Sequence, residues 1–531
     1  MINPNTVVRD SRPEQGQPAI AGPAPPGADH GDPRRWWILA AMALPAFLLN
    51  IDFYGISVAL PAIGEAFAAG TTALQWTVNG FNLALVAPLI AFGRLGDAVG
   101  RRRSLLAGIV LFALGSAVCG LAADITVLVA GRCLQGLAVA LFSTSPLSIV
   151  TQAFPPARHG LAFGIWGAIG GLGSALGPLL GGALTELLGW RWFFLANVPV
   201  AALTVLLILA LVPESRDGSA PGRGEGLGFL AITLGLGGLV FGLQFGDDWG
   251  WASPAVLAPT LLGLGLLAGF VRRDARQPVP LLDPALLRRR SYLAVLAVTL
   301  TGNFGFAALL FFATLYLQDL LQLGPLAAGL VLAAFSAAFV VTLPLAGAAL
   351  ATQGARRLLA WGMGLMVLAF VLVLGAGEAG LAWMVAALAV AGLGQGLAFN
   401  TTTTAAMDAV PAARAGTASG LLNAARQLGS TLGIAVTGAV FQAIESRGLL
   451  GSLRPHAVLS PEQEDLVRGL LSGSAAARST LAELAPPLAG RVDAVVQTVF
   501  TTALAGGMLL CALVSLLGLA AAYACPRRPK P

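Results

Sequence analysis

The chain has 531 residues, of which 56% are hydrophobic and only 11% are charged, and its net charge is +6 at pH 7. Soluble domains carry about 25% charged residues, so this composition, with a mean hydropathy of +0.81, excludes an ordinary soluble protein and indicates one that lies in a lipid bilayer. The basic balance does not indicate nucleic acid, because the arginines lie between long apolar stretches, where membrane topology explains them.

Residues 1–35 are rich in Pro, Gly and Ala and have no apolar run, which predicts a disordered cytoplasmic tail rather than a cleavable signal peptide. A membrane-spanning helix needs roughly 20 apolar residues, and such windows recur from residue 36 to the C-terminus. They predict fourteen spans, near 36–60, 74–93, 104–122, 126–152, 160–184, 193–212, 226–245, 254–271, 292–317, 326–350, 357–376, 381–406, 416–441 and 498–524.

The charges of the short loops predict the orientation of these spans. Loops on one side are basic, as at 101–103 and 288–290, whereas loops on the other side carry acids such as Asp124 and Glu378. Basic loops stay in the cytoplasm, so both termini are predicted to be cytoplasmic in a multi-pass protein of the inner membrane. The long 445–497 segment, mixed in charge, is predicted to be an extracytoplasmic loop.

The chain also contains an internal repeat. Residues 160–177 recur as residues 416–433 at a fixed offset of 256, and the identical positions include four glycines. Further pairs recur in the same order, namely Gly93 with Gly347, Gly100 with Gly354, and Gln135 with Gln395. Duplicated halves are common in transporters, so we predict an all-α membrane protein with helices arranged 6+2+6. The predicted parts are a first bundle (36–212), an inserted helix pair with its linkers (213–290) and a second bundle (291–531).

The segment between the second and third predicted spans concentrates glycine and charge. It reads GRLGDAVGRRR over residues 93–103, and its glycines predict a very short turn in which the backbone bends or approaches a neighbour closely. The whole string resembles the signature motif of the major facilitator superfamily, which has a fold of two six-helix bundles. The resemblance implies an inner-side contact between the two bundles, formed by Gly93, Asp97, Gly100, Arg101 and Arg102. The alternative for Asp97 is a structural surface salt bridge.

Further strings resemble one branch of that superfamily, the fourteen-helix drug:proton antiporter family (EmrB/QacA type). Residues 52–61 (DFYGISVALP) are similar to its first-helix motif, and residues 190–199 (WRWFFLANVP) are typical of it. The chain has Tyr54 and Ser57 where the family usually has Thr and Asn, which puts the family's substrate range in doubt here. The resemblance also implies an antiporter motif that prevents proton leakage, made of Gly173, Gly177, Pro178, Gly181 and Gly182.

Two charged residues are predicted to lie at the same depth inside the membrane. Asp52 precedes Pro61 by nine residues and Arg132 follows Asp124 by eight, which places them roughly 13 Å and 12 Å below the outer helix ends. We predict that Asp52 and Arg132 face one cavity, and that Asp52 loads and releases a proton, because burial favours the neutral carboxyl. Protonation would weaken the attraction to Arg132 and favour another helix arrangement. The alternatives are an acid that reaches a wet rim and an arginine that only braces helix-end carbonyls.

Arg426 lies near the middle of the thirteenth predicted span, with no obvious acid on a neighbouring span. A buried arginine needs an acid, carbonyl groups or water, so Arg426 either binds anionic substrate groups or braces the second bundle. Other polar side chains within the spans are assigned to the same substrate cavity, and each of them equally fits a hydrogen bond between helices: Tyr54, Asn79, Asn82, Asn303 and Asn400.

Together these features predict a proton-coupled antiporter that exports small amphipathic or cationic compounds. Its predicted partners are a small-molecule substrate, protons and the lipid bilayer, with no nucleic acid, and we expect a monomer. The alternative is a dedicated exporter of a secreted metabolite, antibiotic, siderophore or lipid-like molecule. The 177–182 segment disfavours uptake by symport, and the duplicated bundles disfavour a channel. The four cysteines and three histidines form no CxxC or HExxH pattern, so we expect no metal, no cofactor and no enzyme activity.

Overall fold

A computed structural model describes residues 33–69, 71–214, 225–277, 288–375, 380–410, 415–453 and 486–525. Within these ranges the chain is helical and contains no strand. This confirms the all-α class that the apolar windows predict. Most of the predicted tail, residues 1–32, lies outside the described residues, as do 215–224 and 278–287 in the linkers of the inserted pair.

The helices fall into three groups along the chain. The first group comprises α1 (Arg35–Phe67), α2 (Thr71–Val86), α3 (Leu89–Val99), α4 (Arg101–Gly120), α5 (Ile125–Ser143), α6 (Ser145–Ala153), the short η1 (Pro156–Arg158), α7 (His159–Leu188), α8 (Trp190–Leu195) and α9 (Asn197–Leu211). The second comprises α10 (Glu225–Trp249) and α11 (Pro254–Asp274). The third comprises α13 (Arg290–Leu315), the π-helical η2 (Tyr316–Leu320), α14 (Pro325–Gln353), α15 (Ala355–Leu374), α17 (Leu381–Asp408), α18 (Ala415–Leu453) and α21 (Pro486–Tyr523).

Thirteen helical segments among the described residues are long and apolar enough to cross a membrane, and the bent pair α2 and α3 is a fourteenth if it counts as one span. This agrees with the fourteen predicted spans. Three of the interrupted spans break near a proline: Pro88 between α2 and α3, Pro146 at the start of α6, and Pro199 in the first turn of α9. Proline cannot donate a backbone hydrogen bond and crowds the preceding turn, and the α2–α3 pair is bent by 49° at its break.

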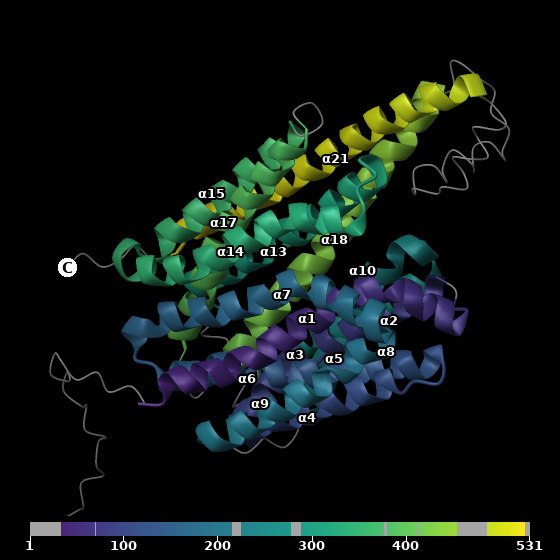
Figure 1. Cartoon of the computed structure of the whole chain (residues 1–531). Helices are drawn as coiled ribbons and strands as arrows, with labels where there is room; N and C mark the ends of the chain where they lie inside the picture. The colour runs from purple at the N-terminus through teal and green to yellow at the C-terminus, as the bar shows by residue number, and fades with distance from the viewer. Residues whose placement is uncertain are drawn as a thin grey trace, which may run out of the picture.

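The first and third groups form two bundles that lie side by side (Figure 1). The bundles meet mainly where α7 packs on α14 and where α3 packs on α18. The inserted helices pair with each other, and α10 also contacts α2, α3 and α18, so it covers the seam between the bundles. Apolar side chains from α3, α10, α11 and α18 fill this seam, among them Ile90, Ile232, Phe270 and Ala424.

Two single-residue turns reflect the repeat. Gly100 alone separates α3 from α4, and Gly354 alone separates α14 from α15. Their φ angles of 124° and 78° lie in the region that favours glycine, so the same turn recurs in both halves. The end of the molecule that holds these turns and the arginines after them is called the basic end below, and the opposite end the acidic end.

Two predicted segments contain more helix than the sequence indicated. Within the motif at 93–103 the predicted turn between spans is Gly100 alone, because α3 continues to Val99 and Asp97 is helical. The 445–497 segment is not a loop throughout: α18 runs on to Leu453 and α21 begins at Pro486, with residues 454–485 outside the described part. Hydropathy marks where a helix leaves the bilayer, whereas the helix itself ends only where its hydrogen bonds stop.

Candidate functional site

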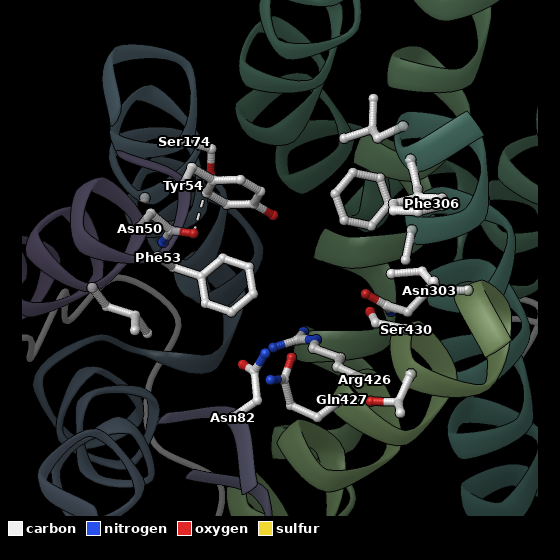
Figure 2. A pocket seen from close by; sticks show the side chains of 18 of the residues that line it. Asn50, Phe53, Tyr54, Asn82, Ser174, Asn303, Phe306, Arg426, Gln427 and Ser430 are labelled. Carbon is white, nitrogen blue, oxygen red and sulfur yellow. Dashed lines mark hydrogen bonds between the residues drawn. The ribbon is translucent and has the colours of Figure 1, made fainter. Parts of the chain in front are cut away.

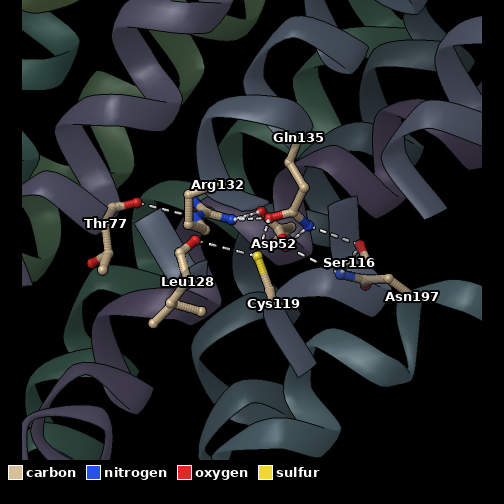
Figure 3. A network of polar contacts seen from close by, with 8 residues as sticks. All are labelled: Asp52, Thr77, Ser116, Cys119, Leu128, Arg132, Gln135 and Asn197. Carbon is tan, nitrogen blue, oxygen red and sulfur yellow. Dashed lines mark hydrogen bonds and ion pairs between the residues drawn. The ribbon is translucent and has the colours of Figure 1, made fainter. Parts of the chain in front are cut away.

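Asp52 lies at the centre of a buried polar network inside the first bundle (Figure 3). Its carboxylate accepts a 2.5 Å hydrogen bond from Arg132 Nη1, which is also an ion pair. It accepts two more, from Gln135 Nε2 at 3.2 Å and from Asn197 Nδ2 at 3.1 Å. Gln135 in turn donates to Ser116 Oγ at 2.8 Å. Three donors converge on one acid, so this arrangement stabilises a charged carboxylate that has lost its water.

Arg132 is held by the protein on several sides. Besides Asp52, it donates from Nε to the Thr77 carbonyl oxygen at 3.0 Å and from Nη1 to Gln135 Oε1 at 2.9 Å. Its guanidinium carbon lies 4.3 Å from the centre of the Phe81 ring, a cation–π distance. Breaking a buried ion pair from one side costs about 3–5 kcal/mol, so a change of charge at Asp52 acts strongly on Arg132.

The helix α1 carries two functional faces. Asn50, Phe53, Tyr54 and Ser57 line a cavity between the bundles, since residues three and four apart share a helix face. Asp52 lies about 200° around the helix from Asn50. Its side chain is 0% exposed, and neither Asp52 nor Arg132 is among the described lining residues. The two residues therefore meet, but they do so beside the cavity rather than in it.

The cavity has a volume of about 750 Å³ and is lined by both bundles and by α10, within the range of small-molecule sites. Figure 2 shows Phe53 and Tyr54 on one side and Phe306 on the other, with Arg426 and its neighbours between them. The lining also reaches residues close to the acidic end, among them Thr314 and Gln318. The cavity thus runs from the middle of the bundles toward the acidic end.

Five of the six side chains assigned to the cavity line it, namely Tyr54, Asn79, Asn82, Asn303 and Arg426. Asn400 is the exception. It is fully buried, is absent from the described lining, and donates from Nδ2 to the Gly160 carbonyl oxygen at 3.0 Å. It therefore connects α17 with α7, which is the helix-to-helix alternative given above for such residues.

The glycines of the predicted antiporter motif lie where α7 crosses α1. A Cβ added at Gly173 would lie 2.5 Å from the Phe47 carbonyl oxygen, and one added at Gly181 would lie 2.7 Å from that of Gly55. Ser174 donates to Asn50 Oδ1 at 3.1 Å across the same crossing. Small residues thus bring α7 against the helix that carries Asp52 and the cavity face, as small residues do in membrane proteins.

This crossing predicts a contrast between two adjacent glycines. Gly181→Ala places a methyl group against backbone, and overpacking of this kind costs about 1–3 kcal/mol. Gly182→Ala meets only Val58 Cγ1 at 3.4 Å, an ordinary contact, and gains helix propensity. We expect Gly181→Ala to lower the midpoint of thermal unfolding of the purified protein and Gly182→Ala to leave it unchanged or raise it. Equal midpoints for the two variants would contradict this account of the crossing.

At the basic end, Asp97 joins the two bundles. Its carboxylate accepts from the backbone N–H groups of Gly416 at 3.1 Å and Thr417 at 2.9 Å, and from Arg101 at 2.7 Å. Because α18 begins at Ala415, these N–H groups have no acceptor within their own helix. An acid at a helix N-terminus is favoured by the helix dipole. Asp97 therefore caps α18 from the other bundle, while Arg102 donates to Leu209 O within its own bundle.

Two glycine contacts related by the repeat accompany this cap. A Cβ at Gly93 would lie 2.6 Å from the Gly416 carbonyl oxygen, and a Cβ at Gly160 would lie 2.6 Å from that of Gly347. Gly93 corresponds to Gly347 in the repeat, and Gly160 corresponds to Gly416. The same backbone contact thus forms twice, once from each half, which closes the basic end.

Several partners in these contacts were not predicted from the sequence. Asn197 and Ser116 complete the Asp52 network, although Asn197 stands in the string 190–199 that carries the family resemblance. His159 Nδ1 lies 2.7 Å from Asp408 Oδ1 and so links α7 to α17 at the basic end. His159 follows Arg158 in an unremarkable basic segment, and no pattern in the sequence pairs it with an acid 249 residues away.

Comparison with known proteins agrees with this architecture. The model of the Major Facilitator Superfamily matches residues 42–434. The chain is 36% identical over 452 residues to the multidrug resistance protein Stp of Mycobacterium tuberculosis, covering 84% of this chain and 83% of that protein. It is 36% identical over 447 residues to a probable actinorhodin transporter of Streptomyces coelicolor, covering 81% and 76%.

Among solved structures, the human organic anion transporter MFSD10 (TETRAN) shares the fold, with a TM-score of 0.58 at 17% identity over 91% of this chain and all of that one. The family match over residues 42–434 therefore agrees with the structure. The structure has two bundles with a cavity between them, a buried ion pair, and a glycine-lined contact at one end. The chain belongs to the major facilitator superfamily, in its drug-efflux branch.

Proposed function

We propose that this protein exports small amphipathic compounds across the cytoplasmic membrane in exchange for protons. The observation that carries the proposal is the buried Asp52–Arg132 pair on the far side of the helix that lines the cavity. The relatives named multidrug resistance protein and actinorhodin transporter support export of drugs or antibiotics. The multi-pass architecture supports a place in the membrane.

In the proposed cycle, protonation of Asp52 removes the negative charge that Arg132 contacts. The ion pair then weakens, while Arg132 keeps its bonds to Thr77 and Gln135. Because Phe53 and Tyr54 sit on the same helix as Asp52, a shift of α1 changes the cavity wall. A proton and a substrate thus favour different arrangements of one helix, which is the requirement for coupled exchange.

We propose that the basic end faces the cytoplasm, since the positive-inside rule places basic loops there. The closed contacts at Asp97, Gly93 and Gly160 then seal the inner side, and the cavity extends toward the outer side. The structure would be the outward-facing state, from which a substrate leaves and in which a proton enters. Opening of the same contacts would expose the cavity to the cytoplasm.

The proposed unit is a monomer divided into a first bundle (36–212), an inserted pair (213–290) and a second bundle (291–531), with protons and small molecules as its partners. No metal, cofactor, nucleic acid or enzymatic step is part of the proposal. The relative from Streptomyces coelicolor is named a probable actinorhodin transporter, which supports a second candidate function. In that case the protein would be a dedicated exporter of one antibiotic or secreted metabolite.

An efflux panel in a host that lacks its own pumps tests the proposal. Cells that express the protein should resist several amphipathic compounds and should accumulate less of them than cells with an empty vector. Collapse of the proton gradient with a protonophore should abolish the difference. Export that persists after the collapse would refute proton drive, and resistance to a single compound would favour the dedicated exporter.

A further inference from the structure

The described lining of the cavity has one charged side chain, and that side chain is basic. Among its described lining residues Arg426 is the sole ionisable group with a full charge at neutral pH, and no Asp or Glu lies among them. The remaining polar lining consists of amides and hydroxyls, such as Asn82, Gln244 and Gln427. A cationic cargo would find no carboxylate there, although the family resemblance led us to expect cationic compounds.

Arg426 is bound by neutral groups and has capacity left. Its Nη1 donates to Asn423 Oδ1 at 3.2 Å and its Nη2 donates to Thr403 Oγ1 at 2.5 Å. Its Nε is buried without a hydrogen-bond partner among the described residues, and the whole residue is 7% exposed. Figure 2 shows the guanidinium among Asn82 and Gln427, inside the cavity. A buried arginine without an acid is costly, and an anion brought by the substrate would offset that cost.

The walls near Arg426 fit flat rings. The guanidinium carbon lies 3.9 Å from the centre of the Phe399 ring. From Phe399 a series of ring contacts leads through Phe339 and Phe335 to Phe306, with centroid separations of 5.6, 5.9 and 5.1 Å. Phe53 and Tyr54 face Phe306 from the other bundle (Figure 2). An aromatic frame gains by stacking in such a cavity, with its acidic group directed at Arg426.

We propose that the preferred substrates are planar aromatic compounds that carry an acidic group, a carboxylate or an ionised phenol, and that Arg426 recognises this group. The proposal rests on the proposed export function and specifies its substrate class. It also selects between the two roles left open for Arg426, because this guanidinium lines the cavity and its described hydrogen-bond partners are neutral groups. Exchange of such an anion for an entering proton moves charge across the membrane, so the membrane potential assists it.

The test measures binding of three anthracenes to the purified full-length protein by fluorescence. The probes share one planar frame and differ in charge: 9-anthracenecarboxylate, 9-anthracenemethanol and 9-(aminomethyl)anthracene, which is a cation at neutral pH. Because a hydrogen bond to a charged group is worth about ten- to hundredfold in affinity, the protein should bind the carboxylate at least about tenfold more tightly than the ammonium. Equal binding of the two, or tighter binding of the ammonium, would overturn the proposal.

Variants assign the preference to Arg426. Arg426→Gln should weaken carboxylate binding by about tenfold or more and remove the discrimination between the probes, whereas Arg426→Lys should keep the order. Gln427→Glu retains Arg426 and adds an acid beside it, so it should reduce carboxylate binding and improve ammonium binding even if Arg426→Gln fails to fold.

The matched control is Arg191→Gln, which removes an arginine that stacks on Trp190 outside the cavity and should leave the binding of all three probes unchanged. A loss of all three probes to the same extent in folded Arg426→Gln would show a bracing role and overturn the proposal.

Failure of this inference is distinguishable from failure of the proposed function. Suppose that a pH gradient drives transport of neutral 9-anthracenemethanol in proteoliposomes while the binding assay shows no preference for the carboxylate. The proposed substrate class is then wrong, and proton-driven export stands. If the carboxylate preference is found but no probe moves in response to a pH gradient, Arg426 forms an anion site and the export function is wrong.

Discussion

Asp52→Asn is expected to abolish proton-driven export while leaving exchange of substrate without a gradient intact. The amide cannot release a proton at working pH, but it keeps the shape that Gln135 and Asn197 contact. Proteoliposomes with a defined pH gradient should therefore accumulate substrate only to the level of protein-free vesicles. Exchange of labelled for unlabelled substrate at equal pH should persist, because that exchange needs cavity movement and no net proton transfer.

The control for this result is Asp124→Asn, the same chemical change at the acid that caps the start of α5. It should retain pH-driven accumulation. Asp52→Asn leaves the Arg132 charge unpaired, which costs up to about 3–5 kcal/mol of folding stability. The double variant Asp52→Asn with Arg132→Gln removes both charges and therefore tests the same loss of the carboxylate without an unpaired arginine. Full pH-driven accumulation by folded Asp52→Asn would show that the coupling proton is carried elsewhere.

Gly93→Ala is expected to open the basic end. The added methyl group would lie 2.6 Å from the Gly416 carbonyl oxygen, and backbone cannot move aside without separating α3 from α18. A cost of about 1–3 kcal/mol that falls only on the closed arrangement shifts its population relative to the open one by about 5- to 150-fold. Transport should fall because the protein returns less often to the outward-facing state.

Spin labels placed through Arg103→Cys and Arg357→Cys, both exposed at the basic end, should report a longer distance distribution in Gly93→Ala. The matched control is Gly96→Ala, on the same helix, where the added carbon would meet Ser104 Oγ at 3.6 Å. That variant should keep the parental distances and transport rate. Parental distances in both variants would contradict the proposed role of the glycine contact.

The number and class of the helices could be predicted from the sequence because the bilayer imposes a length on each apolar stretch and requires its backbone to be helical. The repeat could be predicted for a related reason. A glycine that allows a one-residue turn or a close backbone contact cannot easily be replaced, so Gly93, Gly100, Gly347 and Gly354 remain visible as pairs.

The pairing of polar side chains could not be predicted in the same way. Asn303 and Asn400 are alike in sequence, each a single amide in an apolar helix, yet the first lines the cavity and the second binds the Gly160 carbonyl oxygen. Depth along a helix follows from residue count, which is why Asp52 and Arg132 were expected at one level. The rotation of each helix follows from packing, so the sequence alone did not show that both residues point away from the cavity.

The central claim is that binding of a proton at Asp52 and binding of a substrate in the cavity favour different arrangements of α1. Proton release on substrate binding tests this claim most directly. The compound that the efflux panel identifies as the best substrate is added to the purified protein in weakly buffered solution, and the measurement is repeated over a series of starting pH values. Reciprocal coupling requires that a substrate which favours deprotonated Asp52 displaces protons when it binds. The parental protein should release protons and Asp52→Asn should release none at equal substrate occupancy; release of the same size by both would contradict coupling through Asp52.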